Sequence, residues 1–191
     1  MVGASGDLAK KKTYPSLLYL YENNLLPSDV QIWGYARSAK THQELRDHLY
    51  PYLIKNSSEI VVQDFLQRCF YHYGSSYGDE DAYKALMEQM DDFERQAPSP
   101  ATNRLFYLAI PPNCFAETGV AIKSTGMSTS GWTRVIIEKP FGRDLESCEE
   151  LLRTLSGQFQ EDHLFRIDHY LGSKFFIGYT HGMVSTAVNF V

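Results

Sequence analysis

The feature that most constrains the fold is an alternation along most of the chain between segments typical of strands and segments typical of helices. Residues 104–110 and 133–137 are rich in branched and aromatic side chains, as buried strands are. Segments with helical spacing of apolar residues, or with a helix-start signal, flank them. This alternation predicts an α/β fold: a Rossmann-like, doubly wound parallel sheet with helices on both faces.

The remaining predicted elements follow the same alternation. Helices are expected over residues 7–23, 41–52, 81–94 and 144–159, and short strands over residues 30–35 and 164–167. The helix after Thr41 has the clearest start, because Thr41 and Glu44 form a capping box. By contrast, only Met1 and Val2 precede the first turn, so the first strand is predicted to be nearly absent.

Composition narrows the class of protein. The 191 residues suit one domain, and 43% hydrophobic with 21% charged residues suit a packed core. A net charge of -5 argues against nucleic-acid binding, and the apolar runs are too short to cross a membrane. Cys69, Cys114 and Cys148 are too far apart to form a metal-ligand pair, so free thiols, no metal site and a cytoplasmic location are expected.

A glycine-containing turn opens the first predicted helix. Gly3 and Gly6 let the backbone turn sharply and approach a phosphate, and the start of a helix attracts anions. Short glycine turns before helices are common, so the turn alone is weak evidence. Three lysines, residues 10–12, oppose the helix dipole, which suggests either a bound anion or a solvated basic patch.

Arg37 follows the second predicted strand, where a dinucleotide-binding fold meets the adenosine ribose. A carboxylate at this point binds the 2′-hydroxyl of NAD, whereas an arginine accommodates the 2′-phosphate of NADP. The sequence there is GYARS, without a carboxylate. Arg37 therefore predicts a preference for NADP, with an exposed arginine of no special role as the alternative.

Two further strands end at residues that suit the ligand-binding edge of such a sheet. Prolines 111 and 112 stop the strand over residues 104–110, and Glu138-Lys139-Pro140 ends the next one, with a cis proline as a possibility. Lys139 would project into the same crevice as the glycine turn. After the last predicted strand, RIDHYLG brings a cation, a carboxylate, an imidazole and a phenol together, a combination that suits a phosphorylated ligand.

Five motifs, GASGDLAKKK, GYARS, FYLAIPP, EKPFGRDL and RIDHYLG, occur in this order between residues 3 and 172. Together they make the chain resemble the glucose-6-phosphate dehydrogenase family. The resemblance implies a coenzyme domain over residues 1–172 and a non-matching tail over residues 173–191. It also implies NADP-dependent oxidation of glucose 6-phosphate at C1 to 6-phosphoglucono-1,5-lactone, in the pentose phosphate pathway, by homodimers or tetramers.

The resemblance also implies roles for individual residues. Arg37 would bind the 2′-phosphate, Lys139 would contact both coenzyme and substrate, and Phe115 would replace a tyrosine that touches the coenzyme. Asp168 would support catalysis beside His169 and Tyr170, which would bind the sugar phosphate. The coenzyme pyrophosphate would be wrapped by Gly3, Ala4, Ser5, Gly6, Asp7, Leu8, Ala9 and Lys10.

The chain departs from the family pattern after residue 172. Ser173 stands where the family has a phosphate-binding lysine, and Lys174 is displaced by one residue. The family's larger α+β domain, with its histidine base, has no counterpart in the sequence, and His181 does not match the motif around that base. We therefore expect a truncated chain that binds NADP weakly and turns over little or nothing, which an assay of NADPH formation checks.

Two other functions stay open on the sequence. Another family of two-domain sugar oxidoreductases also places Glu-Lys-Pro after a Rossmann strand, but would not carry RIDHYLG or GASGDLAKKK. Alternatively, the chain is a non-catalytic NADP-binding or interaction module that pairs with full-length subunits. Co-purification with a full-length dehydrogenase would favour this second function.

Overall fold

The computed structural model describes residues 1–96, 102–140 and 145–167. Its strands are β1 (Ile32–Ala36), β2 (Cys69–Tyr73), β3 (Arg104–Leu108), β4 (Thr133–Glu138) and β5 (Leu164–Ile167). Its helices are η1 (Ala9–Thr13), α1 (Tyr14–Glu22), α2 (His42–Leu53), α3 (Glu59–Gln67), α4 (Glu80–Glu94), η2 (Pro112–Cys114), α5 (Phe115–Ala121), η3 (Ile122–Gly126), α6 (Leu145–Gln158) and η4 (Glu161–His163). The α/β alternation predicted from the sequence is confirmed.

All strand pairs are parallel, and a very short N-terminal segment joins them into one sheet. β1 pairs with β2, while β4 lies between β3 and β5. Val2 forms parallel bridges to Tyr35 of β1 and to Leu108 of β3. The first strand, predicted to be nearly absent, is thus reduced to the residues around Val2, and the order is β2-β1-Val2-β3-β4-β5.

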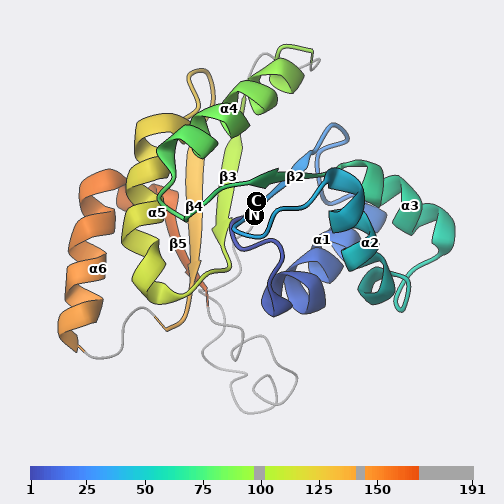
Figure 1. Cartoon of the computed structure of the whole chain (residues 1–191), viewed down its shortest axis with the longest axis horizontal. Coiled ribbons are helices and arrows are strands. Elements are labelled where there is room, and N and C mark those ends of the chain that lie inside the picture. Colours follow the sequence, from blue (N-terminus) through green and yellow to red (C-terminus); the bar gives the residue numbers. More distant parts are fainter. Residues whose placement is uncertain (97–101, 141–144, 168–191) are drawn as a thin grey trace.

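Helices cover both faces of β1, as a doubly wound sheet requires. Every residue of β1 is buried. Trp33 and Tyr35 belong to a core shared with α4, α5 and α6, whereas Ile32 and Ala36 belong to a second core shared with α1, α2 and α3. Figure 1 shows α1, α2 and α3 gathered around the β1–β2 end and α5 and α6 beside β4 and β5.

The helix boundaries follow local signals in the sequence. The Thr41 hydroxyl accepts from the Glu44 N–H at 3.1 Å, and the Glu44 carboxylate accepts from the Thr41 N–H at 2.6 Å, so the predicted capping box is confirmed. The helix predicted from residue 7 is also present, but its first part, η1, is a π-helix. The sequence pattern did not predict α3, β2 or α5, which are short elements of nine, five and seven residues.

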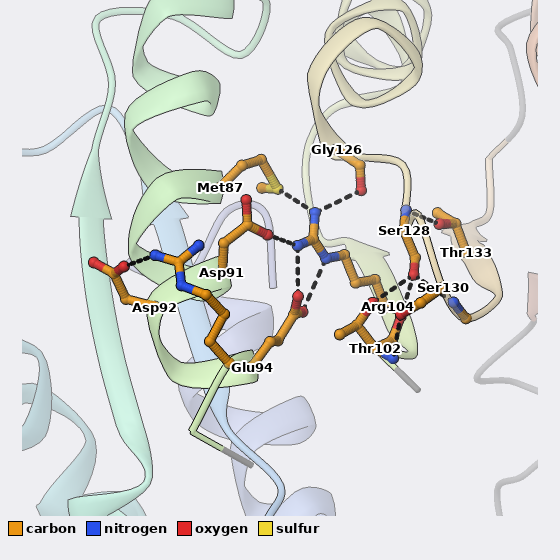
Figure 2. A network of polar contacts seen from close by, with 12 residues as sticks. Met87, Asp91, Asp92, Glu94, Thr102, Arg104, Gly126, Ser128, Ser130 and Thr133 are labelled. Atoms are coloured by element: carbon orange, nitrogen blue, oxygen red, sulfur yellow. Dashed lines mark hydrogen bonds and ion pairs between the residues drawn. The ribbon is translucent and has the colours of Figure 1, made fainter. Parts of the chain in front are cut away.

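A buried arginine ties three elements together at the amino end of β3 (Figure 2). Arg104 is 6% exposed. Its guanidinium donates to both oxygens of Glu94, at 2.9 and 2.7 Å, and to Asp91, both on α4. It also reaches Met87 Sδ at 3.3 Å and the Gly126 carbonyl, on η3, at 3.4 Å. This network fixes α4 and η3 against the sheet at the edge where the strands begin.

Replacing Arg104 by methionine should lower the free energy of unfolding by roughly 2–4 kcal/mol, because Glu94 and Asp91 would lose their shared cation. Urea denaturation measures the change. Arg95→Met is the matched control: it removes an exposed ion pair with Asp92 one turn away and should cost less than about 0.5 kcal/mol. Equal losses in the two variants would contradict a special role for the buried network.

Candidate functional site

Several of the predicted site residues meet at the carboxyl edge of the sheet. The turn over residues 3–9, called the glycine turn below, follows Val2, Arg37 follows β1 and Lys139 follows β4. Parallel strands place their carboxyl ends at one edge, and ligands of doubly wound sheets bind there. Asp168, His169 and Tyr170 come after β5 in the sequence, and they, like Ser173 and Lys174, lie outside the described residues.

Backbone geometry explains the first glycine of the turn. Gly3 has a φ of 87°, in the left-handed region that favours glycine. A Cβ on Gly3 would lie 2.2 Å from the Ala109 carbonyl oxygen. The turn closes with a hydrogen bond from the Gly6 N–H to the Gly3 carbonyl, at 3.0 Å. The Lys10 N–H then donates to the Gly6 carbonyl at 3.2 Å as the chain enters the helix. The chain therefore reverses sharply at the sheet edge and enters η1 without a side chain at the bend.

Gly34 of β1 allows the glycine turn to lie directly on the sheet. A Cβ on Gly34 would be 2.7 Å from Ala4 Cβ and 2.9 Å from the Tyr14 hydroxyl. Ala4 and Tyr14 are both fully buried. Gly34 begins the GYARS motif, but the need for glycine there is not visible in the sequence, because only the packed structure shows what approaches it.

The lysines after the turn have an acidic partner within the chain. Lys10 and Lys11 each lie 2.7 Å from a carboxylate oxygen of Asp7. Hydrogen bonds from the two lysines lower the pKa of Asp7 to about 2. The Lys10 side chain is only 16% exposed and its Nζ lies 5.5 Å from the centre of the Tyr52 ring. Asp7 thus offsets part of the positive charge of the lysines. From the sequence alone, this charge suggested either a bound anion or a solvated basic patch.

Arg37 lies on an aromatic support beside the glycine turn. Its guanidinium carbon is 4.7 Å from the centre of the Tyr77 ring. The next residue, Ser38, accepts a hydrogen bond from the Tyr71 hydroxyl at its carbonyl, at 2.6 Å. Burial raises the pKa of Tyr71, while hydrogen bonds with Ser38 and Ser5 act against that rise. Tyr71 therefore links the Arg37 loop with the glycine turn, a role hidden from sequence analysis because β2 was not predicted.

Lys139 directly follows β4 and is preceded by a buried carboxylate. Glu138 is 7% exposed and accepts a hydrogen bond from the Tyr107 hydroxyl of β3. The Lys139–Pro140 peptide bond is cis, the isomer that the sequence left open. The Lys139 N–H donates to the Ile167 carbonyl at 3.4 Å, and the side chain is exposed. The structure thus brings Lys139 to the same edge as the glycine turn and Arg37.

Phe115 lies in a different environment from the other predicted residues. It begins α5, is 1% exposed, and belongs to the core shared with α4 and α6. Its ring has no open surface to offer a ligand in this structure, so its contact with the coenzyme stays a prediction. Apolar character at this position is accounted for by packing.

Three further observations on the described residues concern metal ions, cysteines and membranes. None of their histidines, cysteines and acidic residues gather in threes around a point where a metal ion would be held. Cys69 and Cys114 are free, and burial raises the pKa of the Cys69 thiol to about 12, so it is protonated at neutral pH. Within the same residues, every helix is too short or too polar to traverse a bilayer.

The fold and its edge define a Rossmann-like dinucleotide-binding domain. The family model described as "Glucose-6-phosphate dehydrogenase, NAD binding domain" matches residues 1–176, and the chain belongs to this family.

Curated relatives and solved structures support the same family assignment. Glucose-6-phosphate 1-dehydrogenase 1, chloroplastic, of Arabidopsis thaliana is 44% identical over 179 residues, 91% of this chain and 30% of that protein. The Caenorhabditis elegans glucose-6-phosphate 1-dehydrogenase is 43% identical over 90% of this chain and 33% of its own length. The chain thus spans about a third of the length of these relatives.

Among solved structures, a glucose-6-phosphate dehydrogenase in complex with its substrate glucose-6-phosphate aligns with a TM-score of 0.84 and 42% identity. The alignment covers 91% of this chain and 36% of that one. The Mycobacterium avium glucose-6-phosphate 1-dehydrogenase aligns with a TM-score of 0.76 and 30% identity, over 90% of this chain and 36% of its own.

Substituting Gly34 by alanine should lower the free energy of unfolding by roughly 1–3 kcal/mol, because the new methyl group would press the glycine turn off β1. Thermal denaturation followed by circular dichroism measures the loss. In Gly157→Ala, the matched control on α6, an added Cβ meets nothing within 4 Å. That variant should hold or gain stability, by up to roughly 1 kcal/mol. A Gly34→Ala protein as stable as the wild type would contradict the close contact.

Proposed function

We propose that this chain supplies the coenzyme site, and one side of the sugar-phosphate site, for NADP-dependent oxidation of glucose 6-phosphate to 6-phosphoglucono-1,5-lactone. In that reaction C1 of the sugar loses a hydride to the nicotinamide and its hydroxyl loses a proton. The observation that carries the proposal is the placement of the glycine turn, Arg37 and Lys139 at one edge of the sheet. Family membership supports the same activity.

The residues at the glycine turn fit a dinucleotide pyrophosphate. Gly3 and Gly6 leave the backbone without Cβ atoms at the bend, and an added Cβ on Gly6 would lie 3.1 Å from the Gly3 carbonyl oxygen. The first N–H groups of the helix after the turn lie at the positive end of the helix dipole, and together they favour the binding of an anion. Lys10, held by Asp7, adds a cation next to them. We propose that residues 3–10 wrap the pyrophosphate, with Ser5 and Leu8 as part of that turn.

Arg37 supports NADP rather than NAD as the coenzyme. It follows β1 directly, where the adenosine ribose of a dinucleotide lies in this fold. The planar guanidinium pairs two phosphate oxygens, and stacking on Tyr77 keeps it near that position. No carboxylate is present in the GYARS segment to bind a free 2′-hydroxyl.

On the substrate side, we propose that Lys139 contacts both the coenzyme and the sugar. A solved relative that is 42% identical is described in complex with glucose-6-phosphate, which supports this substrate. Asp168, His169 and Tyr170 keep the roles that the family resemblance implies, support of catalysis for Asp168 and phosphate binding for the other two. Homodimers or tetramers and a cytoplasmic location stay predictions, and several relatives are named chloroplastic.

Arg37→Ala should weaken NADP binding by about ten- to a hundredfold, because a charge-assisted, two-point contact with the 2′-phosphate is lost. NAD, which lacks that phosphate, should bind equally well to variant and wild type. Quenching of protein fluorescence measures the dissociation constants. Arg153→Ala, which removes an exposed arginine from α6, is the control and should change neither constant. An unaltered preference for NADP over NAD in Arg37→Ala would rule out this role.

A further inference from the structure

His48 lies on the side of α2 that faces the glycine turn. One helical turn later, Tyr52 places its ring 5.5 Å from Lys10 Nζ, so this side of α2 meets the start of η1. His48 itself is half-buried, next to the backbone of Ser5. Its Nε2 atom is buried and has no hydrogen-bond partner within the described part of the chain. The imidazole ring, which interacts with the Ser5 backbone and has an Nε2 atom unpaired among the described residues, therefore lies beside the turn of the proposed pyrophosphate site.

The charges around His48 come from three segments. Asp7 approaches from the glycine turn, Lys10 from η1 and Lys40 from the loop before α2, while Tyr52, whose ring contacts Lys10, is a titratable group on α2 itself. Burial lowers the pKa of His48, and Lys10 and Lys40 lower it further; the Ser5 backbone and Asp7 act in the opposite direction. Without a ligand, the ring is therefore neutral at neutral pH, in surroundings that an added anion would change.

We infer that His48 is an additional coenzyme-binding residue, whose imidazole takes up a proton when the dinucleotide pyrophosphate binds beside Ser5. The anion offsets the positive charge of Lys10 and Lys40, and the protonated ring adds a cation to the same phosphate site. The inference rests on the proposed function, because it requires the coenzyme phosphates at residues 3–10. It adds to that function a dependence of coenzyme affinity on pH.

The direction of the pH dependence follows from linkage. Binding raises the His48 pKa from its lowered value, so the additional affinity is fully present below the pKa of the free protein. It is lost as the pH rises through the pKa of the complex. A rise of about one unit on binding corresponds to about tenfold tighter binding by the protonated form.

The test compares NADP dissociation constants of wild type and His48→Gln by isothermal titration calorimetry between about pH 5.5 and pH 8. Glutamine keeps a polar side chain but does not titrate. The ratio of the variant's constant to that of the wild type should be about 1 at the high end and about 5–10 at the low end. The 2′-phosphate of NADP also titrates in this range, but it contributes equally to both constants and cancels in the ratio.

His163→Gln is the matched control, since η4 precedes β5 and lies at the opposite edge of the sheet. The ratio of its NADP dissociation constant to that of the wild type should stay near 1 at every pH. A ratio for His48→Gln that is the same at all pH values would overturn the inference, because loss of a structural contact alone is independent of pH. Failure of the wild type to bind NADP at any pH would instead overturn the proposed function, and this inference with it.

A second measurement does not depend on the variant's folding. The ring signal of His48 in the wild-type chain is titrated by nuclear magnetic resonance with and without saturating NADP. The midpoint should move to higher pH when NADP is present, by about one unit. An unchanged midpoint in a chain that demonstrably binds NADP would refute the role of His48.

Discussion

The insertion of Val2 between β1 and β3 is the interaction on which the rest of the structure depends. On one side, the Gly3 N–H donates to the Tyr35 carbonyl at 2.8 Å, and on the other the Val2 N–H donates to Tyr107 at 2.8 Å. Val2 is 2% exposed and fills the space between the two halves of the sheet. Without this segment, β1–β2 and β3–β5 would be separate ladders, and the residues at their carboxyl ends would not share an edge.

The two edges of the sheet differ in the role of their polar residues. At the amino edge, Arg104 and its carboxylates join α4 and η3 to β3, a polar network that is centred on a buried guanidinium and serves stability (Figure 2). At the carboxyl edge, the glycine turn, Arg37 and Lys139 keep their polar groups near the surface. Loops on a rigid scaffold suit binding, because the strands fix where each loop begins while its side chains stay available.

Charge at the carboxyl edge is positive, but acidic and titratable groups within the chain moderate it. Asp7 pairs with two lysines, and His48 adds a group whose charge depends on its surroundings. Partial pairing of this kind reduces the repulsion between the cations in the free protein, and it suits the phosphate binding that we propose for them. The chain is a family member that spans about a third of its relatives' length, and these residues are the ones for which we propose a coenzyme-binding role.

Local patterns in the chain were sufficient for the α/β class, for the helix begun by Thr41, and for the buried strands β3 and β4. Each of these depends on neighbours within a few residues, such as the Thr41–Glu44 pair. Short elements such as β2 and α3 could not be predicted from local patterns. Pairing with β1 stabilises β2, and packing against α2 stabilises α3. The same reason hid Gly34, Tyr71 and His48: each matters through residues far along the chain. Only the folded sheet decides that such distant groups meet at one edge.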